Sequence, residues 1–569
     1  MRPAQLRPGQ SIAFDLMLSL LAGASYILLV LGPGVVNPSN VSWLHGDPVN
    51  YYVGWGMYRQ DPNWHWPLTF TNRIGYPAGE SLAVLDAVPL LIVPLKLLSR
   101  CLPPVFQYFG LLAIAAFSLQ FFFGMRLFRF LFGPDLPAVI LSSAFLLVSP
   151  PLTARLSGHY SLINQWLLVA AVLIYGKAVS RRKPPDVRRL LYSAGTLAAC
   201  SVAINPYLAL MTVAILVSSI AALFLLDRLS IRRAAAAAAG MAITCLLAAW
   251  AAGLLTPGAM AQTGGFRLYS MGLLSFISPI AFGFSLLRFR LLATSGQLEG
   301  FVYLGAGMLG LGSAVAAFAV LRRRWDSDVI RRWAPLLVCA GVFAALALST
   351  KITLGTAVVA DLDPQERISG LFNNSFRATG RFGWVLYYTA AAGILYAAFR
   401  LWPRRAALLA VFAALVIQVV DTSGLRAYVH ASVSKSYALP FRSGEWSSLG
   451  RRYRHLVVLP AWQCGLATPG GDEGFRDFGL LAVSQEMTIN SYSSGRYSDR
   501  SLNEQCDAAV LRATREPLDP QSFYVVTRPI AAIIGRGPSG PGHCRQLDGF
   551  DVCAADFRAE GEGKGPPGS

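Results

Sequence analysis

Long apolar runs without charged residues alternate with short polar stretches from the N-terminus to about residue 420. A helix that crosses the hydrocarbon core of a membrane needs about 20 apolar residues, and roughly 17 are tolerated. This length predicts a mainly α, polytopic membrane protein with about 11 transmembrane helices. The predicted spans are 16–35, 107–125, 136–153, 161–179, 190–205, 207–226, 234–254, 300–321, 333–349, 382–399 and 406–420.

Proline positions decide two ambiguous segments. The uncharged run 190–226 is too long for one span, and Asn205-Pro206 is predicted to divide it into a helical hairpin, because proline cannot continue the hydrogen-bond ladder. The apolar segment 87–98 is short and contains Pro89 and Pro94. It is therefore predicted to be an interfacial or re-entrant helix rather than a further span.

The N-terminal run is interpreted as a transmembrane helix that is not cleaved. Arg2 and Arg7 precede it, as basic residues precede a secretory signal. A signal has an apolar region of roughly 7–15 residues and then a cleavage site. Here the apolar run continues well past Ala22-Gly23-Ala24, which favours a membrane anchor.

Composition and charge support the membrane class. The chain is 54% hydrophobic and only 14% charged, whereas soluble domains carry about a quarter charged residues. The net charge of +19 comes from short basic clusters between apolar runs, which is the cytoplasmic-loop bias of membrane proteins rather than a nucleic-acid signal. With 11 spans, the N-terminus and all of these clusters are cytoplasmic: Arg126 and Arg129; Arg181, Arg182, Lys183, Arg188 and Arg189; Arg228, Arg232 and Arg233; Arg322 to Arg324; Arg400, Arg404 and Arg405.

The chain is predicted to divide into a transmembrane domain, 1–421, with a long first external loop, 36–106, and an extracytoplasmic α/β domain, 422–569. In the second domain, β-like runs such as "HLVVLP" and "SFYVVT" alternate with turns rich in Gly, Ser and Asp. The final "EGEGKGPPGS" is predicted to be disordered. Four cysteines outside the membrane allow two disulfides, with four free thiols as the alternative: Cys464, Cys506, Cys544 and Cys553.

The unusual polar residues gather on the predicted external face, whereas the predicted spans contain almost no ionisable residue. His45 and Asp47 lie in "WLHGDPVNYYVGW", and Asp86 follows in the same loop. The remaining ones are His159 in "LSGHYSLINQW", and Arg377 and Arg381 in "FRATGRFGW". Any chemistry is therefore expected at the external interface.

Each candidate also has a purely structural explanation. Asp47 before Pro48 suits a turn or a helix cap, and Asp86 suits an N-cap of the next helix. His159 could hydrogen-bond a backbone carbonyl. Arg377 and Arg381 could be interfacial anchors, although anchors concentrate on the cytoplasmic side. Their i,i+4 spacing would place both guanidinium groups on one helix face, which suits bidentate binding of a phosphate or diphosphate.

Five motifs together resemble the GT-C superfamily of membrane glycosyltransferases, in a bacterial branch. They are "HGDPVNYY", "SGHYSLINQW", "YSMGLLSFISP", "FVYLGAGML" and "FRATGRFGW". The layout agrees over nearly all of residues 10–421, with an acidic residue in a long first external loop, a "GHxxL"-type external turn and many spans, and an external α/β domain follows at 422–569.

The resemblance implies an inverting sugar transfer in the bacterial inner (cytoplasmic) membrane, with the C-terminal domain periplasmic or extracellular. A polyprenyl-phosphate-linked sugar is the implied donor and co-substrate, and the acceptor is a cell-envelope glycan, lipid or protein. The implied base is an acidic residue of the first external loop, which is Asp47 here. Some members use a DxD or ExD pair with a divalent metal, but this chain has only a late "DLD", Asp361 and Asp363, so metal dependence stays open.

The residue chemistry agrees with this reading. A carboxylate can take the proton of an acceptor hydroxyl, and arginines can stabilise the leaving phosphate. Asp47, Asp86 and His159 are thus the catalytic candidates. The substrate-binding candidates are His45, Tyr51, Tyr52, Arg377 and Arg381; the tyrosines would stack on a sugar ring or form an interfacial aromatic belt.

Two other classes of protein remain as alternatives. A transporter or flippase for an envelope precursor usually has ionisable residues or broken helices at mid-membrane. Here the spans are nearly free of charge, and the one clear break, Asn205-Pro206, is at a predicted external turn. A non-catalytic envelope assembly protein, whose external domain binds a partner, is the third reading.

Overall fold

The structure is a computed structural model that describes residues 8–181, 186–255, 265–279, 282–288, 291–322, 327–373, 376–494, 496–497, 499–538 and 543–557. Predictions that concern Arg2, Arg7, Arg182, Lys183, Arg323, Arg324 and the final "EGEGKGPPGS" lie outside these residues. Contacts divide the chain into two units. Unit 1 contains 1–43, 103–248 and 263–435, and unit 2 contains 44–102, 249–262 and 436–569.

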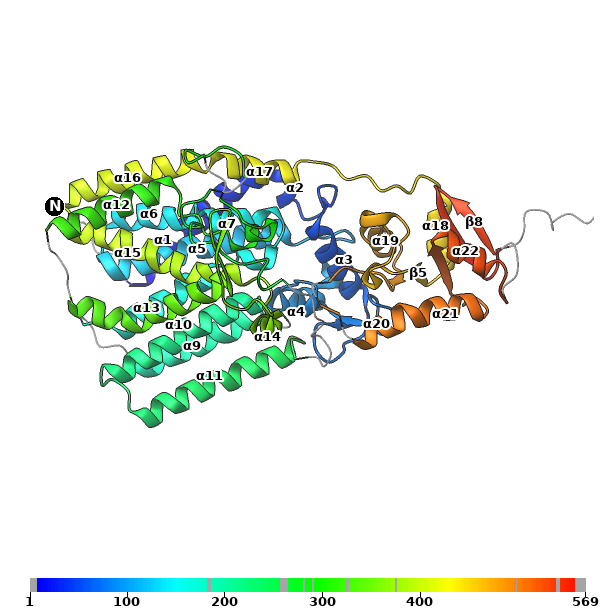
Figure 1. Cartoon of the computed structure of the whole chain (residues 1–569), viewed down its shortest axis with the longest axis horizontal. Coiled ribbons are helices and arrows are strands. Elements are labelled where there is room, and N and C mark those ends of the chain that lie inside the picture. The colour runs from blue at the N-terminus through cyan, green and yellow to red at the C-terminus, as the bar shows by residue number, and fades with distance from the viewer. Residues whose placement is uncertain are drawn as a thin grey trace, which may run out of the picture. The chain divides into compact units, whose positions relative to one another are not determined.

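Unit 1 is built of long apolar helices that run side by side (Figure 1). Short helical turns and one hairpin, β3 (Lys351–Leu354) with β4 (Ala357–Asp361), connect them. The α-helices are α1 (Pro8–Leu31), α2 (Pro33–Val36), α5 (Phe109–Phe132), α6 (Leu136–Leu147), α7 (Pro150–Ala154), α8 (Trp166–Ala178), α9 (Val187–Val202), α10 (Pro206–Leu225), α11 (Ile231–Ala251), α12 (Ala306–Leu321), α13 (Ser327–Leu348), α14 (Arg367–Asn373), α15 (Gly383–Leu401), α16 (Arg404–Asp421) and α17 (Ser423–Val433).

Eight helical segments of the described residues are long and apolar enough to cross a membrane. The bent pair α16 and α17, with 43° between its helices, would make a ninth. The count of 11 is therefore not confirmed. The predicted span 190–205 corresponds to α9, which has only 16 residues, and 300–321 corresponds to the short α12. The eight segments are Ile12–Leu31, Phe109–Phe132, Leu136–Ser157, Tyr160–Ala178, Pro206–Leu225, Ile231–Ala251, Asp328–Leu348 and Thr379–Leu401.

The helical hairpin at Asn205-Pro206 is confirmed. Helix α9 ends at Val202, and α10 begins at Pro206, where proline costs nothing because the first N–H of a helix has no partner in its own helix. The side chain of Asn205 accepts hydrogen bonds from the backbone N–H groups of Tyr207 (2.9 Å) and Leu208 (3.4 Å). Asn205 is therefore the N-cap that starts the second helix.

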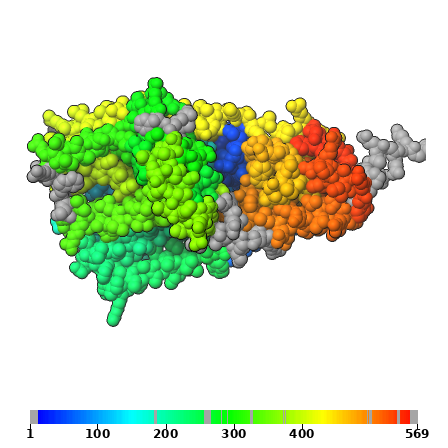
Figure 2. Space-filling model, viewed as in Figure 1, coloured from blue at the N-terminus to red at the C-terminus, as the bar shows by residue number. Residues whose placement is uncertain are grey.

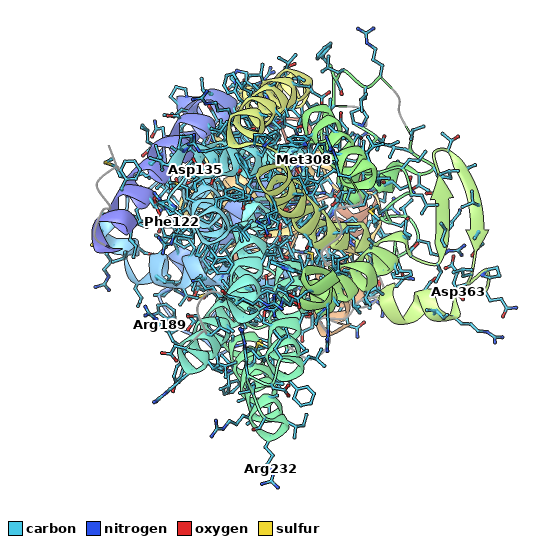
Figure 3. All side chains as sticks on the ribbon, turned by 90° about the vertical axis from the view of Figure 1, so that its left-hand side faces the viewer. Phe122, Asp135, Arg189, Arg232, Met308 and Asp363 are labelled. Atoms are coloured by element: carbon cyan, nitrogen blue, oxygen red, sulfur yellow. A yellow bond between two sulfur atoms is a disulfide. The ribbon has the colours of Figure 1, made fainter. Side chains whose placement is uncertain are left out.

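Basic residues lie at one end of the helices of unit 1, and Figure 3 faces this end, with Arg189 and Arg232 labelled. Arg129 of α5 forms a bidentate ion pair with Asp15 of α1, a fully buried carboxylate, at 2.6 and 2.9 Å. Arg228, after α10, donates to the carbonyl oxygens of Ala178 (2.7 Å) and Ser180 (2.6 Å). This grouping is what the positive-inside rule expects, and the cytoplasmic orientation of this end stays a prediction.

Unit 2 contains a five-stranded sheet with the strand order β6-β5-β7-β9-β8. The predicted strands "HLVVLP" and "SFYVVT" form β5 and β7, which pair in parallel at its centre. The strands are β5 (His455–Leu459), β6 (Thr488–Ile489), β7 (Ser522–Val526), β8 (Cys544–Leu547) and β9 (Phe550–Ala554), and the helices around them are α18 (Glu445–Arg452), α19 (Gly471–Ser484), α20 (Asp499–Gln505), α21 (Asp507–Arg515) and α22 (Arg528–Ile534). The two disulfides that the cysteine count allowed are present, Cys464–Cys506 and Cys544–Cys553.

The first loop is part of the same unit. Its helix α3 (Asp47–Gln60) packs on α19: Gly56 faces Val483 and Gly479 faces Val53, so the two backbones approach closely. Its remaining elements are β1 (Phe70–Thr71), β2 (Glu80–Ser81) and α4 (Pro89–Leu97). Helix α4 is the short helix predicted at 87–98, and its nine residues, about 14 Å long, cannot cross a membrane.

Candidate functional site

Two arginines, a glutamate and a histidine of unit 1 meet at the turns between its helices. Glu299 is the centre, and its Oε2 accepts hydrogen bonds from Arg155 (Nη1, 2.7 Å) and Arg381 (Nε, 3.0 Å; Nη2, 2.8 Å). Its Oε1 lies 3.2 Å from Nε2 of His159. We call these four residues the Glu299 cluster. It joins two predicted site residues, His159 and Arg381, to two that the sequence analysis missed.

Each member of the Glu299 cluster sits on a short 3₁₀ turn or immediately beside one. Arg155 begins η3 (Arg155–Ser157), His159 caps η4 (Tyr160–Ile163), Glu299 lies in η5 (Ser295–Gly300) and Arg381 lies in η6 (Thr379–Phe382). Gly300 and Gly380 bring η5 and η6 together, because a Cβ at Gly380 would lie only 2.5 Å from the Cα of Gly300. Residues without side chains at this crossing allow Glu299 and Arg381 to meet.

Aromatic rings support the guanidinium groups. Arg381 lies 4.7 Å from the ring centroid of Tyr207, and Arg155 lies 5.3 Å from that of Trp384. The Tyr207 hydroxyl also accepts a hydrogen bond from the backbone N–H of Ala378 at 3.0 Å. Because each arginine has a ring beside it and a carboxylate in front of it, both guanidinium groups are held in fixed orientations.

The Glu299 cluster has an excess of positive charge. Burial alone raises the pKa of Glu299, but Arg381, Arg155 and the hydrogen bond from His159 outweigh it and hold this pKa well below its usual range. Glu299 therefore stays ionised and is a poor base. Two guanidinium charges face one carboxylate, so the cluster carries one net positive charge before any contribution from His159. The side chains are 7% (Arg155) to 26% (His159) exposed, and such a partly buried site favours an anion.

Arg377 does not share a helix face with Arg381, so this prediction is wrong. Residue 377 precedes η6 and is not helical, and only from Thr379 onward does the chain turn. The guanidinium of Arg377 lies 5.5 Å from the ring centroid of Tyr269 instead. The i,i+4 argument assumed an α-helix, whereas α15 begins only at Gly383.

The predicted candidates of the first loop lie in unit 2. Asp47 is the first residue of α3 and is exposed, and its negative charge acts on Arg476 of α19. Asp86 has a left-handed backbone (φ 56°) and is not the N-cap of α4, which is Val88. His45 is half-buried, whereas Tyr51 and Tyr52 are buried, with 8% and 6% exposed.

Glu299 and Arg155 carried only a weak signal in the sequence. Each is a single charged residue between apolar segments, in "GQLEGFVYLG" and "LTARLSGHY". Ionisable residues in such places mark functional sites in membrane proteins, and this criterion would have selected both. Their pairing was not visible, because 144 positions separate them.

The late "DLD" pair has a structural role. Asp363 accepts hydrogen bonds from the backbone N–H groups of Arg367 (2.9 Å) and Ser369 (2.7 Å), so it holds the start of α14. Asp361 forms an ion pair with Arg267. In the part of the chain that the structure describes, no group of three or more His, Cys, Asp or Glu residues could hold a metal ion.

Asp477 of α19 is a buried carboxyl that sequence reasoning did not single out. It is 7% exposed, and its Oδ1 has no hydrogen-bond partner among the described residues. Burial raises its pKa from 3.8 to about 6. Between these pH values the folded protein keeps a proton that the unfolded chain releases, so the free energy of unfolding falls as the pH rises from about 4 to about 6.

We expect Asp477→Asn to remove this pH dependence. At pH 8 the ionised Asp477 lowers the free energy of unfolding of the wild-type protein by about 3 kcal/mol, so the variant should unfold at a temperature higher by about 2 °C, after allowance for the buried amide. Thermal unfolding of the full chain in detergent, measured from pH 4 to pH 8, tests this. Asp472→Asn, an exposed change on the same helix, is the control and should leave the pH profile unchanged. An unchanged profile in Asp477→Asn would contradict the assignment.

Comparisons with known proteins give a family and distant structural likenesses. The chain is similar to the crystal structure of the Archaeoglobus fulgidus oligosaccharyltransferase in complex with Zn and sulfate, with 12% identity and a TM-score of 0.38, over 92% of this chain and 70% of that chain. No curated protein matches the chain. The family described as domain of unknown function DUF6311 matches residues 20–423, and the DUF6311 C-terminal domain matches residues 445–555. The chain therefore belongs to the DUF6311 family.

Proposed function

We propose that this protein is a membrane glycosyltransferase that moves a sugar from a polyprenyl-phosphate-linked donor to an extracytoplasmic acceptor. The observation that carries the proposal is the Glu299 cluster. A donor of this class ends in a phosphate, and departure of the sugar leaves more negative charge on that phosphate. The cluster offers what such a leaving group needs, which is two oriented guanidinium groups with an excess of positive charge.

The role of Glu299 in this proposal is to orient the arginines. A carboxylate that accepts three hydrogen bonds from two guanidinium groups fixes their directions before the donor arrives. Hydrogen-bond donors that already point toward the leaving phosphate need no reorganisation during the reaction, and this is why such sites stabilise developing charge well. His159 lies beside Glu299, with its Nε2 3.2 Å from Oε1, and adds a third contact that fixes the position of the carboxylate.

Asp47 is proposed to be the base that activates the acceptor. It is exposed, so a hydroxyl group can reach its carboxylate, and its place at the first turn of α3 favours its negative charge. Removal of a proton by a positioned carboxylate contributes about 10²-fold to 10⁴-fold in rate. Asp86 is the second candidate for this role in the same loop.

The side of the membrane on which the transfer is proposed to occur follows from the length and direction of α15. Arg381 lies two residues before α15 and Arg400 lies in its last turn, so the 19-residue helix separates the Glu299 cluster from the basic end of unit 1 by about 28 Å. If the basic end is cytoplasmic, as the positive-inside rule predicts, the cluster lies near the external face. The transfer would then take place outside the cytoplasm.

Binding of polyprenyl phosphate to the purified protein in detergent tests the donor assignment. We expect the wild-type chain to bind polyprenyl phosphate and to bind the matching polyprenol, which has the same chain and no phosphate, much more weakly. A polyprenyl-phosphate-linked sugar should then be consumed only when an acceptor is present. Equal binding of the two lipids would remove the phosphate from the assignment and leave only an apolar surface.

A further inference from the structure

A basic cavity lies at the other end of unit 1 from the Glu299 cluster. Its volume is about 510 Å³, and it is lined by the last residues of α5 and α15, by residues that follow α8 and by the first turns of α6, α13 and α16. The charged side chains in its wall are Arg181, Arg332, Arg400, Arg404, Asp135 and Asp328. Asp135 is labelled in Figure 3, which faces this end.

The basic cavity has more positive than negative groups. Asp328 forms ion pairs with Arg181 (2.7 Å) and Arg332 (3.0 Å), and Asp135 pairs with Arg404 (2.6 Å). Four guanidinium groups against two carboxylates leave two positive charges. Arg400 is exposed and forms no ion pair with any residue that the structure describes. The site can therefore accept an anion without breaking an existing pair.

An apolar slot opens directly from the basic cavity. Its volume is about 370 Å³, and it shares Leu131, Val329, Tyr396 and Arg400 with the cavity wall. Further along, its walls come from α12, α13 and α15 and include Trp333 and Gly393. Figure 2 shows the surface hollowed between the green and yellow-green segments near this end. Two of these helices, α13 and α15, are candidate membrane spans, so the slot lies at membrane depth.

We infer that the slot and the basic cavity bind one anionic glycerophospholipid, with an acyl chain in the slot and the headgroup phosphate among the arginines. Arginine binds phosphate oxygens through two N–H groups at once, and anionic headgroups attract basic residues at a membrane surface. A free phosphate would leave the apolar slot empty, and an apolar molecule would leave the four arginines without an anion. The combination of both features in one continuous hollow fits an amphiphile.

This lipid would be separate from the sugar donor. The basic cavity is about 28 Å from the Glu299 cluster along α15, which is close to the full thickness of the hydrocarbon core. The bound lipid would connect α5, α13 and α15, which line both hollows. It would therefore stabilise the helix bundle, whether or not the proposed transfer is correct.

Lipid binding to the full-length protein in a neutral detergent tests this inference. Phosphatidylglycerol should bind and raise the unfolding temperature, whereas phosphatidylcholine with the same acyl chains and inorganic phosphate at equal concentration should not. Arg400→Gln should weaken phosphatidylglycerol binding roughly fivefold, since one arginine near a membrane surface contributes about that much. Arg405→Gln is the matched control, because this exposed neighbour does not line the cavity, and it should bind like the wild type.

A second variant tests the slot separately. A Cβ at Gly393 meets no atom within 4 Å, so Gly393→Leu should fold, extend into the slot and exclude the acyl chain. Phosphatidylglycerol should then lose its stabilising effect although every arginine is present. Equal stabilisation by phosphatidylcholine, an equal effect of inorganic phosphate, or unchanged lipid binding in both Arg400→Gln and Gly393→Leu would overturn the inference.

Discussion

Asp47→Asn is expected to lower the rate of sugar transfer by about 10²-fold or more while the protein stays folded and inserted in the membrane. Asparagine keeps the shape of the side chain but cannot take a proton from an acceptor hydroxyl. The fold should tolerate the change, because Asp47 is exposed at the first turn of α3 and asparagine is accepted at helix starts. The measurement is the transfer rate at saturating donor and acceptor, with purified protein at equal concentration.

Asp472, a carboxylate on α19, provides the control for Asp47 on α3. Asp472 is also exposed and, like Asp47, acts electrostatically on Arg476. Asp472→Asn therefore removes a similar charge near the same guanidinium without removing the proposed base, and it should keep nearly full activity. If Asp472→Asn and Asp47→Asn lose activity equally, the effect is electrostatic. If Asp47→Asn is fully active and Asp86→Asn is not, the base is Asp86.

Arg381→Lys is expected to lower transfer by about 10²-fold although the charge is kept, because removal of one oriented donor from a site that stabilises a leaving anion has an effect of this size. Arg381 presents Nε and Nη2 to the same oxygen of Glu299, and a lysine ammonium cannot reproduce this planar arrangement. The affinity for polyprenyl phosphate should fall as well. Excess donor should restore the rate only in part, since the same contact acts on both the bound donor and the departing phosphate.

Arg377→Lys separates this effect from a general loss of positive charge. Arg377 lies four positions before Arg381, no hydrogen bond joins it to Glu299 among the described residues, and its guanidinium lies against the ring of Tyr269. The Arg377→Lys variant should therefore bind polyprenyl phosphate nearly as the wild-type protein does. If Arg381→Lys also binds and transfers normally, both arginines are interfacial anchors, and the donor phosphate binds elsewhere.

Local patterns in the sequence predicted the helices well and the contacts between them poorly. Eight of the predicted spans reappear because apolar length is a local property, and Asn205-Pro206 fixed its hairpin by backbone chemistry alone. The failures were at helix ends. Arg377 and Arg381 were assigned to one helix face because the apolar run that follows them gives no sign that its first turn is a 3₁₀ turn.

The contacts within the Glu299 cluster could not be predicted from the sequence. Its partners are separated by 140 positions (His159), 144 positions (Arg155) and 82 positions (Arg381), and no spacing rule covers such distances. His159 and Arg381 could be recognised because each stands in an unusual motif, but nothing local in the sequence indicates that they share one carboxylate. Likewise, the pairing of the first loop with residues 436–557 depends on long-range packing that hydrophobic periodicity does not encode.

Unit 2 combines segments that are far apart in the chain, so its first segment must wait during synthesis until its partner has been made. Gln60 of α3 donates a hydrogen bond to the carbonyl oxygen of Val483, 423 positions later. At 5–20 residues per second, a ribosome needs roughly 20 to 85 s to reach that partner. During this interval, the side of α3 that packs on α19, including Val53 and Gly56, lacks its partner helix. A nascent chain of this kind would depend on a chaperone to protect its first loop. Premature termination before α19 would leave an intermediate with exposed apolar surface, which proteases would remove.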